Sequence, residues 1–355
     1  MNIRYTKLRA EMARLGLDAM WITSAANHLY MSGFDNPDGW MLVTKDKSYV
    51  FADFRYIEAA KKGAFPECTV IMPEGGRKKY LLPILEENGI KVIGYEDMAL
   101  TCAGLAALKN DLQGYEFVPV GMMLEEIRSI KTEEEIEKIV EAQRIAESAL
   151  DQLLSGLNYD MTEVEVAAEL EYFIKKRGAK ISFETIAVSG TASALPHGVP
   201  RNVKLERGFL TLDFGAVVDG YHSDMTRTVV IGKADADIRR VYDTVLKAQL
   251  AAIDAIAEGR KNADMDKVAR DIIDGAGYKG CFGHSLGHGV GLQVHEEPRL
   301  SWATGDRTLR AGEIVTVEPG VYLEGKYGCR IEDMVVVGVG GNRNLTLSPK
   351  ELIEI

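Results

Sequence analysis

Five residues with metal-binding side chains lie in the second half of the sequence: Asp213, Asp224, His288, Glu318 and Glu332. Each occurs in a strand-like or glycine-rich stretch, where a charged side chain is otherwise unfavourable. Four carboxylates and one imidazole form a hard, oxygen-rich ligand set, which suits two divalent cations better than one closed zinc site. This set predicts hydrolysis assisted by metal ions.

The two aspartates flank a strong hairpin signal, Asp219–Gly220. Both turn residues tolerate the positive φ angles of a type I′ turn. A two-residue turn places Asp213 opposite Thr226 and on the same face as Asp224, whereas a three-residue loop moves Asp224 to the other face. Taken singly, each aspartate is better explained by a salt bridge or by solvation. As a pair they favour a metal site, because a carboxylate inside the apolar run FLTLDF is costly unless it is paired or bound to a cation.

Three of the six histidines lie in GHSLGHGVGLQVHEEP, residues 283–298, among glycines that let backbone approach a bound group. We interpret His288 as a metal ligand, His295 as a substrate contact and His284 as support for the ligands. The spacing alone leaves the order of these roles open. His197, between two prolines in ALPHGVP, is in isolation only part of a rigid loop. Beside a metal pair it becomes a candidate hydrogen-bond donor to a tetrahedral intermediate.

The segments TVEPG and RIED contain the two glutamates. Arg330 lies two residues before Glu332 on the same strand face, where it could orient a ligand carboxylate. Taken alone, Glu318 is explained by a strand end that faces water, and Glu332 by a surface ion pair. Four clustered carboxylates, however, would raise one another's pKa values. Two divalent cations would cancel that charge and allow a bridging hydroxide at neutral pH.

Composition limits the class of protein. A chain of 355 residues with 46% hydrophobic and 27% charged residues is long enough for two globular domains. The net charge of −11 argues against nucleic acid or an anionic membrane as a partner. No apolar run approaches the ~18 residues of a membrane span, and the first residues lack the apolar segment of a signal peptide. The four cysteines are too widely spaced for a CxxC pair, so we expect free thiols and a cytoplasmic protein.

The order of the expected elements indicates two domains, residues 1–125 and 126–355. The first alternates short strands and helices, as α/β domains do, and contains no catalytic cluster. The second opens with two amphipathic helices, each preceded by a capping box, Thr132 with Glu135 and Thr162 with Glu165. Its remaining expected elements are strands near 183–188, 209–218 and 221–231 and helices over 236–258 and 263–274.

The second domain resembles the pita-bread metallopeptidases, the group of methionine aminopeptidase, aminopeptidase P and prolidase. The ordered ligand set, ALPHGVP, the histidine-rich segment, TVEPG and RIED resemble the branch of that group that cleaves before proline. The segment ANHLYMSGF, residues 26–34, makes the first domain similar to the creatinase-type N-terminal domain of the same branch. Creatinase itself shares this fold but lacks the metal ligands, so the complete set argues against creatinase activity. The fold class implied is α/β (α+β), with a creatinase-like domain followed by a pita-bread catalytic domain.

The resemblance also implies roles for the ligands. Asp213 would hold one metal ion, Asp224 and Glu332 would bridge both, and His288 with Glu318 would complete the other. The family usually uses Mn²⁺ or Co²⁺, and sometimes Zn²⁺ or Fe²⁺.

The remaining roles concern water, substrate and support. Glu318 would also orient and deprotonate the nucleophilic water. His197 and His295 would contact the scissile carbonyl and its developing charge. Arg330 would support Glu332, and Thr226 would lie beside the ligands.

The reaction implied is removal of an N-terminal residue from a peptide with proline at the second position. We place an Xaa-Pro aminopeptidase, which accepts longer peptides, ahead of an Xaa-Pro dipeptidase, or prolidase. Arg299, four residues after His295, could pair with the carboxylate of a dipeptide, although a surface arginine in a polar loop explains it equally well. A non-catalytic binding protein of the same fold is the remaining alternative, and the complete ligand set disfavours it. Family members are often homodimers, so we expect one here.

Overall fold

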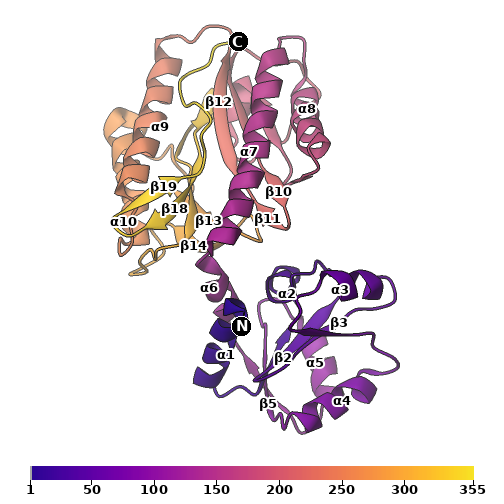
Figure 1. Cartoon of the computed structure of the whole chain (residues 1–355). Helices are drawn as coiled ribbons and strands as arrows, with labels where there is room; N and C mark the ends of the chain where they lie inside the picture. The colour runs from indigo at the N-terminus through magenta and orange to yellow at the C-terminus, as the bar shows by residue number, and fades with distance from the viewer. Residues whose placement is uncertain (1) are drawn as a thin grey trace. The chain divides into compact units, whose positions relative to one another are not determined.

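The computed structural model describes residues 2–355. It divides into two compact units, one ending at Arg128 and one running from Ser129 to Ile355. Both units have the mixed α/β architecture expected from the sequence (Figure 1). Among residues 2–355, no helix is both long enough and apolar enough to cross a membrane.

The first unit is built on one sheet with the strand order β4-β3-β2-β1-β5-β6, and helices surround it (Figure 1). Strand β2 is antiparallel to both its neighbours, whereas β5 is parallel to β1 and β6. Its elements in chain order are α1 (Ile3–Arg14), β1 (Ala19–Ile22), α2 (Ala25–Ser32), β2 (Trp40–Thr44), β3 (Ser48–Phe51), α3 (Ile57–Gly63), β4 (Cys68–Ile71), α4 (Arg77–Glu87), β5 (Val92–Tyr95), α5 (Cys102–Asp111), β6 (Glu116–Pro119) and α6 (Met123–Ser129).

The second unit begins with two long helices and continues with short strands. Its elements are α7 (Glu133–Gly156), α8 (Glu163–Lys176), β7 (Lys180–Ile181), β8 (Ile186–Ser189), a 3₁₀ turn (Gly190–Ala194), β9 (Gly208–Phe214), β10 (Ala216–Val218), β11 (Tyr221–His222), β12 (Met225–Ile231), α9 (Ala236–Ala255), α10 (Asn262–Ile273), a π-turn (Asp274–Tyr278), β13 (Gly287–Gly289), β14 (Glu296–Leu300), β15 (Ile314–Val317), β16 (Gly320–Leu323), β17 (Tyr327–Arg330), β18 (Asp333–Gly338) and β19 (Gly341–Asn344).

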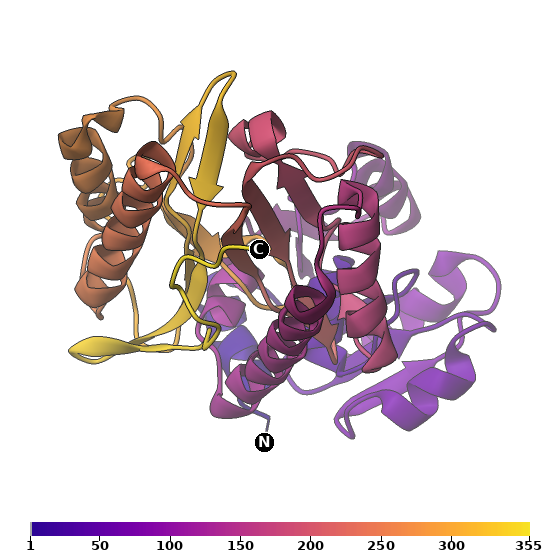
Figure 2. The same cartoon turned by 90° about the horizontal axis from the view of Figure 1, so that it is seen from above.

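The strands of the second unit lie between two pairs of helices (Figure 2). One core packs α7 and α8 against β9 and β12, and the other packs α9 and α10 against β15 and β18. Strand β12 is buried along its whole length, because both its faces are covered. The charged side chains that enter these strands therefore face a packed interior and need partners.

Local signals in the sequence explain where the helices of this unit begin. The hydroxyls of Thr132 and Thr162 each accept a hydrogen bond from the amide three residues later, and the carboxylates of Glu135 and Glu165 accept one from the amide of the cap residue. Both predicted capping boxes are thus confirmed, and they fix the first turns of α7 and α8.

Candidate metal centre

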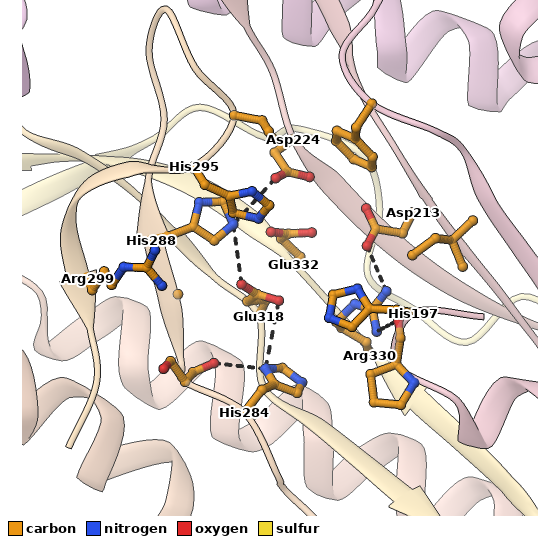
Figure 3. A pocket seen from close by; sticks show the side chains of 16 residues that line it. His197, Asp213, Asp224, His284, His288, His295, Arg299, Glu318, Arg330 and Glu332 are labelled. Carbon is orange, nitrogen blue, oxygen red and sulfur yellow. Dashed lines mark hydrogen bonds and ion pairs between the residues drawn. The ribbon is translucent and has the colours of Figure 1, made fainter. Parts of the chain in front are cut away.

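Ten of the eleven side chains singled out from the sequence line one pocket of about 240 Å³ in the second unit (Figure 3). The eleventh, Thr226, hydrogen-bonds a wall residue, Glu332. The ten come from strands and loops far apart in the chain: His197, Asp213, Asp224, His284, His288, His295, Arg299, Glu318, Arg330 and Glu332. The site is therefore assembled by tertiary folding of the second unit alone.

The two aspartates meet because of the hairpin between them. Asp219 and Gly220 have φ angles of 50° and 85°, so the turn has two residues. The register runs without a bulge from the turn to the pair Thr226–Asp213. Asp224 therefore points to the same side as Asp213, as the two-residue turn predicts (Figure 3).

His288, on β13, presents its Nε2 to the carboxylates. Its Nδ1 lies 3.1 Å from the carbonyl oxygen of Gly289, which fixes the proton on Nδ1. Nε2 then carries a lone pair and lies 3.6 Å from Oδ2 of Asp224 and 3.5 Å from Oε1 of Glu318. Burial, with the neighbouring His295 adding to it, lowers the pKa of His288 to about 3. A neutral imidazole with one nitrogen anchored to backbone is the form that binds a metal ion.

The carboxylates are crowded enough to repel one another. Ligand atoms of Asp224, His288 and Glu332 all lie within 4.8 Å of each other. Burial, together with Asp213 and Glu318, raises the pKa of Asp224 well above its usual value. Burial likewise raises the pKa of Glu332, and it raises that of Glu318 to about 8. A divalent cation among these oxygens would remove the repulsion, so the residues fit a metal centre.

The two carboxylate oxygens of Asp213 have different surroundings. Its Oδ2 accepts a hydrogen bond of 2.7 Å from Nη2 of Arg330. Its Oδ1 is buried and has no hydrogen-bond partner among residues 2–355. A buried oxygen of this kind requires a partner that the protein does not supply, and a cation fits that need.

The sequence led us to expect a direct contact between Arg330 and Glu332, and the structure places a hydroxyl between them. The guanidinium pairs with Asp213, and its Nε donates a hydrogen bond of 3.1 Å to the hydroxyl of Thr226. That hydroxyl donates a hydrogen bond of 2.8 Å to Oε2 of Glu332. Strand β17 ends at Arg330 and β18 begins at Asp333, so Arg330 and Glu332 do not belong to the same strand. The alternation of one continuous strand, on which the expectation rested, therefore does not apply.

Tyr322 is a residue of the site that sequence reasoning missed. Its hydroxyl lies 2.9 Å from Nε2 of His284 and accepts a hydrogen bond of 2.7 Å from Nη1 of Arg330. His284 in turn lies 3.9 Å from Glu318. Tyr322 therefore links Arg330, which holds Asp213, to His284, which lies beside Glu318. No spacing rule marks a tyrosine on a short strand for this role, and only proximity to TVEPG could have suggested it.

The mouth of the pocket carries groups suited to a small substrate. His197, His295 and Arg299 are exposed there, and Phe183 and Ile186 add apolar wall. The His295 ring lies 4.3 Å from the His288 ring, edge to face. Arg299 has no ion-pair partner among residues 2–355. Its guanidinium is thus available to an anionic group of a ligand.

Comparison with known proteins identifies the family of both units. The family model of metallopeptidase family M24 matches residues 137–338, and that of the creatinase/prolidase N-terminal domain matches residues 4–130. The chain is 36% identical over 356 residues to an Xaa-Pro dipeptidase of Pyrococcus horikoshii, with 99% of each chain covered.

Two solved structures show the same likeness. A structure described as an Xaa-Pro dipeptidase from Bacillus anthracis is 39% identical, covers 99% of both chains and has a TM-score of 0.95. An X-Pro aminopeptidase from Thermotoga maritima is 36% identical, covers 97% of this chain and all of its own, and has a TM-score of 0.91. The chain therefore belongs to metallopeptidase family M24, in the branch that carries a creatinase/prolidase N-terminal domain.

Proposed function

We propose that this metallopeptidase is an Xaa-Pro dipeptidase, a prolidase, that uses two divalent metal ions, Mn²⁺ or Co²⁺. The sequence alone placed the Xaa-Pro aminopeptidase first. The names of the relatives from Pyrococcus horikoshii and Bacillus anthracis favour the dipeptidase, which was the alternative. The observation that carries the proposal is Arg299, an unpaired cation at the mouth of a pocket of only about 240 Å³.

Arg299 would select substrate length by charge. A dipeptide presents its own carboxylate one residue beyond the scissile bond, and a guanidinium can bind it through two parallel hydrogen bonds. A longer peptide presents a neutral amide at the same place and leaves the arginine without its anion. The small volume acts in the same direction, because a longer peptide needs room beyond the proline.

Five side chains would hold the metal ions. Asp213, Asp224, His288, Glu318 and Glu332 would supply one nitrogen and a set of carboxylate oxygens. When bound, such ions lower the pKa of a water molecule and polarise a carbonyl oxygen.

Side chains of the protein would transfer the proton, stabilise the developing charge and position the substrate. The carboxylate of Glu318 accepts a proton from the attacking water and returns it to the proline nitrogen as the C–N bond breaks. His197 and His295 donate hydrogen bonds to the carbonyl oxygen of the scissile bond, where negative charge develops. Arg299 holds the carboxylate, so that the scissile carbonyl stays beside the ligands.

The test compares Leu-Pro, its C-terminal amide and the tripeptide Leu-Pro-Gly, each with added manganese. The dipeptidase is expected to cleave Leu-Pro much faster than the other two. Losing a charge-assisted hydrogen bond of about 1.5–3 kcal/mol corresponds to roughly 10- to 100-fold in kcat/KM. The variant Arg299→Gln should remove this preference by slowing Leu-Pro alone. Equal cleavage of all three by the parent protein would instead support the aminopeptidase.

Two further expectations accompany the proposal, formation of a homodimer and a cytoplasmic location. Light scattering of the purified protein tests the first, and fractionation of the source cells tests the second. The non-catalytic alternative would be supported by a protein that binds no metal and cleaves none of the three peptides.

A further inference from the structure

A buried ion pair lies outside the set of residues that line the pocket. Nζ of Lys131 is 2.7 Å from Oε1 of Glu296, and the two side chains are only 2% and 3% exposed. Both residues belong to the second unit. Neither belongs to the proposed ligands or to the groups at the mouth of the pocket. Glu296, however, follows His295 directly in the chain.

Lys131 is held from several directions. Its backbone amide donates a hydrogen bond of 2.9 Å to the carbonyl oxygen of Gly312, and the preceding residue, Ile130, forms a β-bridge with Glu313. The next residue, Thr132, is the cap of α7. The ammonium group is therefore presented from a fixed piece of backbone at the start of the longest helix.

Glu296 holds the loop that carries His295. A Cβ added to Gly291 would lie 2.2 Å from Oε1 of Glu296, so the loop backbone packs directly against the carboxylate that binds Lys131. On its other side the carbonyl oxygen of Gly291 accepts a hydrogen bond of 2.8 Å from the amide of His222. The loop between β13 and β14 is thus clamped near both its ends.

Stability alone does not account for such a pair. Two buried ions lose their hydration, and replacing them by apolar side chains of similar volume is often neutral or stabilising. What an ion pair adds is a fixed geometry, because a carboxylate bound to an ammonium has few alternative positions. The group whose geometry this pair can fix is the neighbouring imidazole, 4.3 Å from the His288 ring.

We propose that Lys131 is a positioning residue for His295, acting through Glu296. The ion pair fixes the loop of residues 290–296, so that the His295 imidazole stays above the pocket beside His288. This inference rests on the proposed function, in which His295 donates to the scissile carbonyl. It gives Lys131 and Glu296 a role in the rate of hydrolysis without contact with substrate or metal.

The test is a double-mutant cycle between Lys131 and His295 with Leu-Pro as substrate. Lys131→Met should lower kcat roughly 10- to 100-fold, with little change in KM and in bound manganese. In a His295→Ala background, the same substitution should cause no further loss, because the group that it positions is already absent. Equal fold-losses in both backgrounds would overturn the inference.

Two other variants separate position from folding. Lys131→Arg keeps the positive charge and should restore most of kcat. Lys131→Met with Glu296→Gln removes both charges of the ion pair and leaves the loop without this contact. The second variant should fold and remain slow; full activity from it would contradict the inference. Val245→Ala, on the buried face of α9, serves as the control for lost stability and should leave kcat unchanged.

A structural measurement keeps the two proposals distinct. Failure of the parent protein to cleave any Xaa-Pro dipeptide would reject the proposed function. Crystal structures of the parent and of Lys131→Met would still test the positioning role. The His295 ring should leave its place 4.3 Å from His288 in the variant. An unmoved ring would refute the role of Lys131.

Discussion

Arg330 binds one oxygen of Asp213 and leaves the other to the pocket. The hydrogen bond from Nη2 to Oδ2 is 2.7 Å long, and the two side chains are 4% and 13% exposed. Oδ1 has no hydrogen-bond partner among the described residues. The protein therefore orients the carboxylate and leaves one of its oxygens available to a ligand. Such an arrangement suits a ligand that must be in place before the cation arrives.

Loss of the hydrogen bond from Arg330 to Asp213 should weaken metal binding. Replacing Arg330 by methionine removes the hydrogen bond but keeps the volume of the aliphatic stem. Metal affinity or kcat is expected to fall roughly 10- to 100-fold, measured by manganese titration and by Leu-Pro hydrolysis. Arg343→Met, which removes a largely exposed arginine 3.4 Å from Glu133, is the matched control and should have no effect. A fully active Arg330→Met would show that Asp213 needs no such orientation.

Removal of Asp224 tests the centre directly. Asp224→Ala takes away an oxygen that lies within 4.8 Å of both His288 and Glu332. We expect loss of Leu-Pro hydrolysis and of bound manganese, because the carboxylate of Asp224 would bind both ions in the proposed centre. Elemental analysis and kinetics on the same sample provide the measurement. Full turnover with full metal content would show that the ligand assignment is wrong.

Metal binding should stabilise the second domain. A ligand that binds only the folded chain at about 100 times its Kd adds about 2.7 kcal/mol to the free energy of unfolding. The relief of repulsion among buried carboxylates acts in the same direction. Thermal unfolding with manganese and with a chelator measures the difference. Identical melting in both solutions would argue against a metal centre.

The first domain should lose stability in mild acid because of His28. Burial lowers the pKa of this histidine to about 4, and its Nδ1 lies 3.2 Å from the carbonyl oxygen of Phe34. With its folded pKa below the unfolded value near 6.5, the stabilisation is complete above pH 6.5 and is lost as pH falls toward 4. At pH 5 the expected loss is about 2 kcal/mol.

Tryptophan fluorescence can isolate this effect. Trp21 stacks on Trp40 in the first domain, with ring centroids 4.1 Å apart. The third tryptophan, Trp302, belongs to the second domain, so a Trp302→Phe background makes the emission specific to the first. Denaturant unfolding at pH 7 and pH 5 should differ in this background, and His28→Gln should reduce the difference. An unchanged pH dependence in that variant would exclude His28 as the cause.

Some features of the site could be predicted because they are local. The Asp219–Gly220 turn fixes the face of two carboxylates, since the side-chain period of a strand is two and the register has no bulge. The capping boxes likewise fix the starts of α7 and α8. In each case a few neighbouring residues contain all the necessary information.

Other features depend on contacts that sequence spacing does not encode. The sequence did not indicate α2. The amides of Thr23 and Ser24, directly before this helix, donate hydrogen bonds to the buried carboxylate of Glu96, which follows the distant strand β5. It also gave Arg330 the nearest acidic neighbour as partner, whereas folding brings Asp213 from another sheet. Tyr322 and Lys131 were missed for the same reason. Lys131 meets Glu296 from 165 residues away, and Tyr322 meets His284 from 38 residues away, so neither contact can be read from local spacing.

The chain order of the ligands constrains when the protein can acquire metal. The two hairpin aspartates come first in the chain, and His288, Glu318 and Glu332 all follow α10. On the ribosome, a growing polypeptide that has reached α10 contains two of the five candidate ligands and so offers at most a weak chelate. Cofactor loading must therefore wait until synthesis of this domain is nearly finished. Cells starved of manganese during translation should accumulate full-length apoprotein that later metal supply can activate.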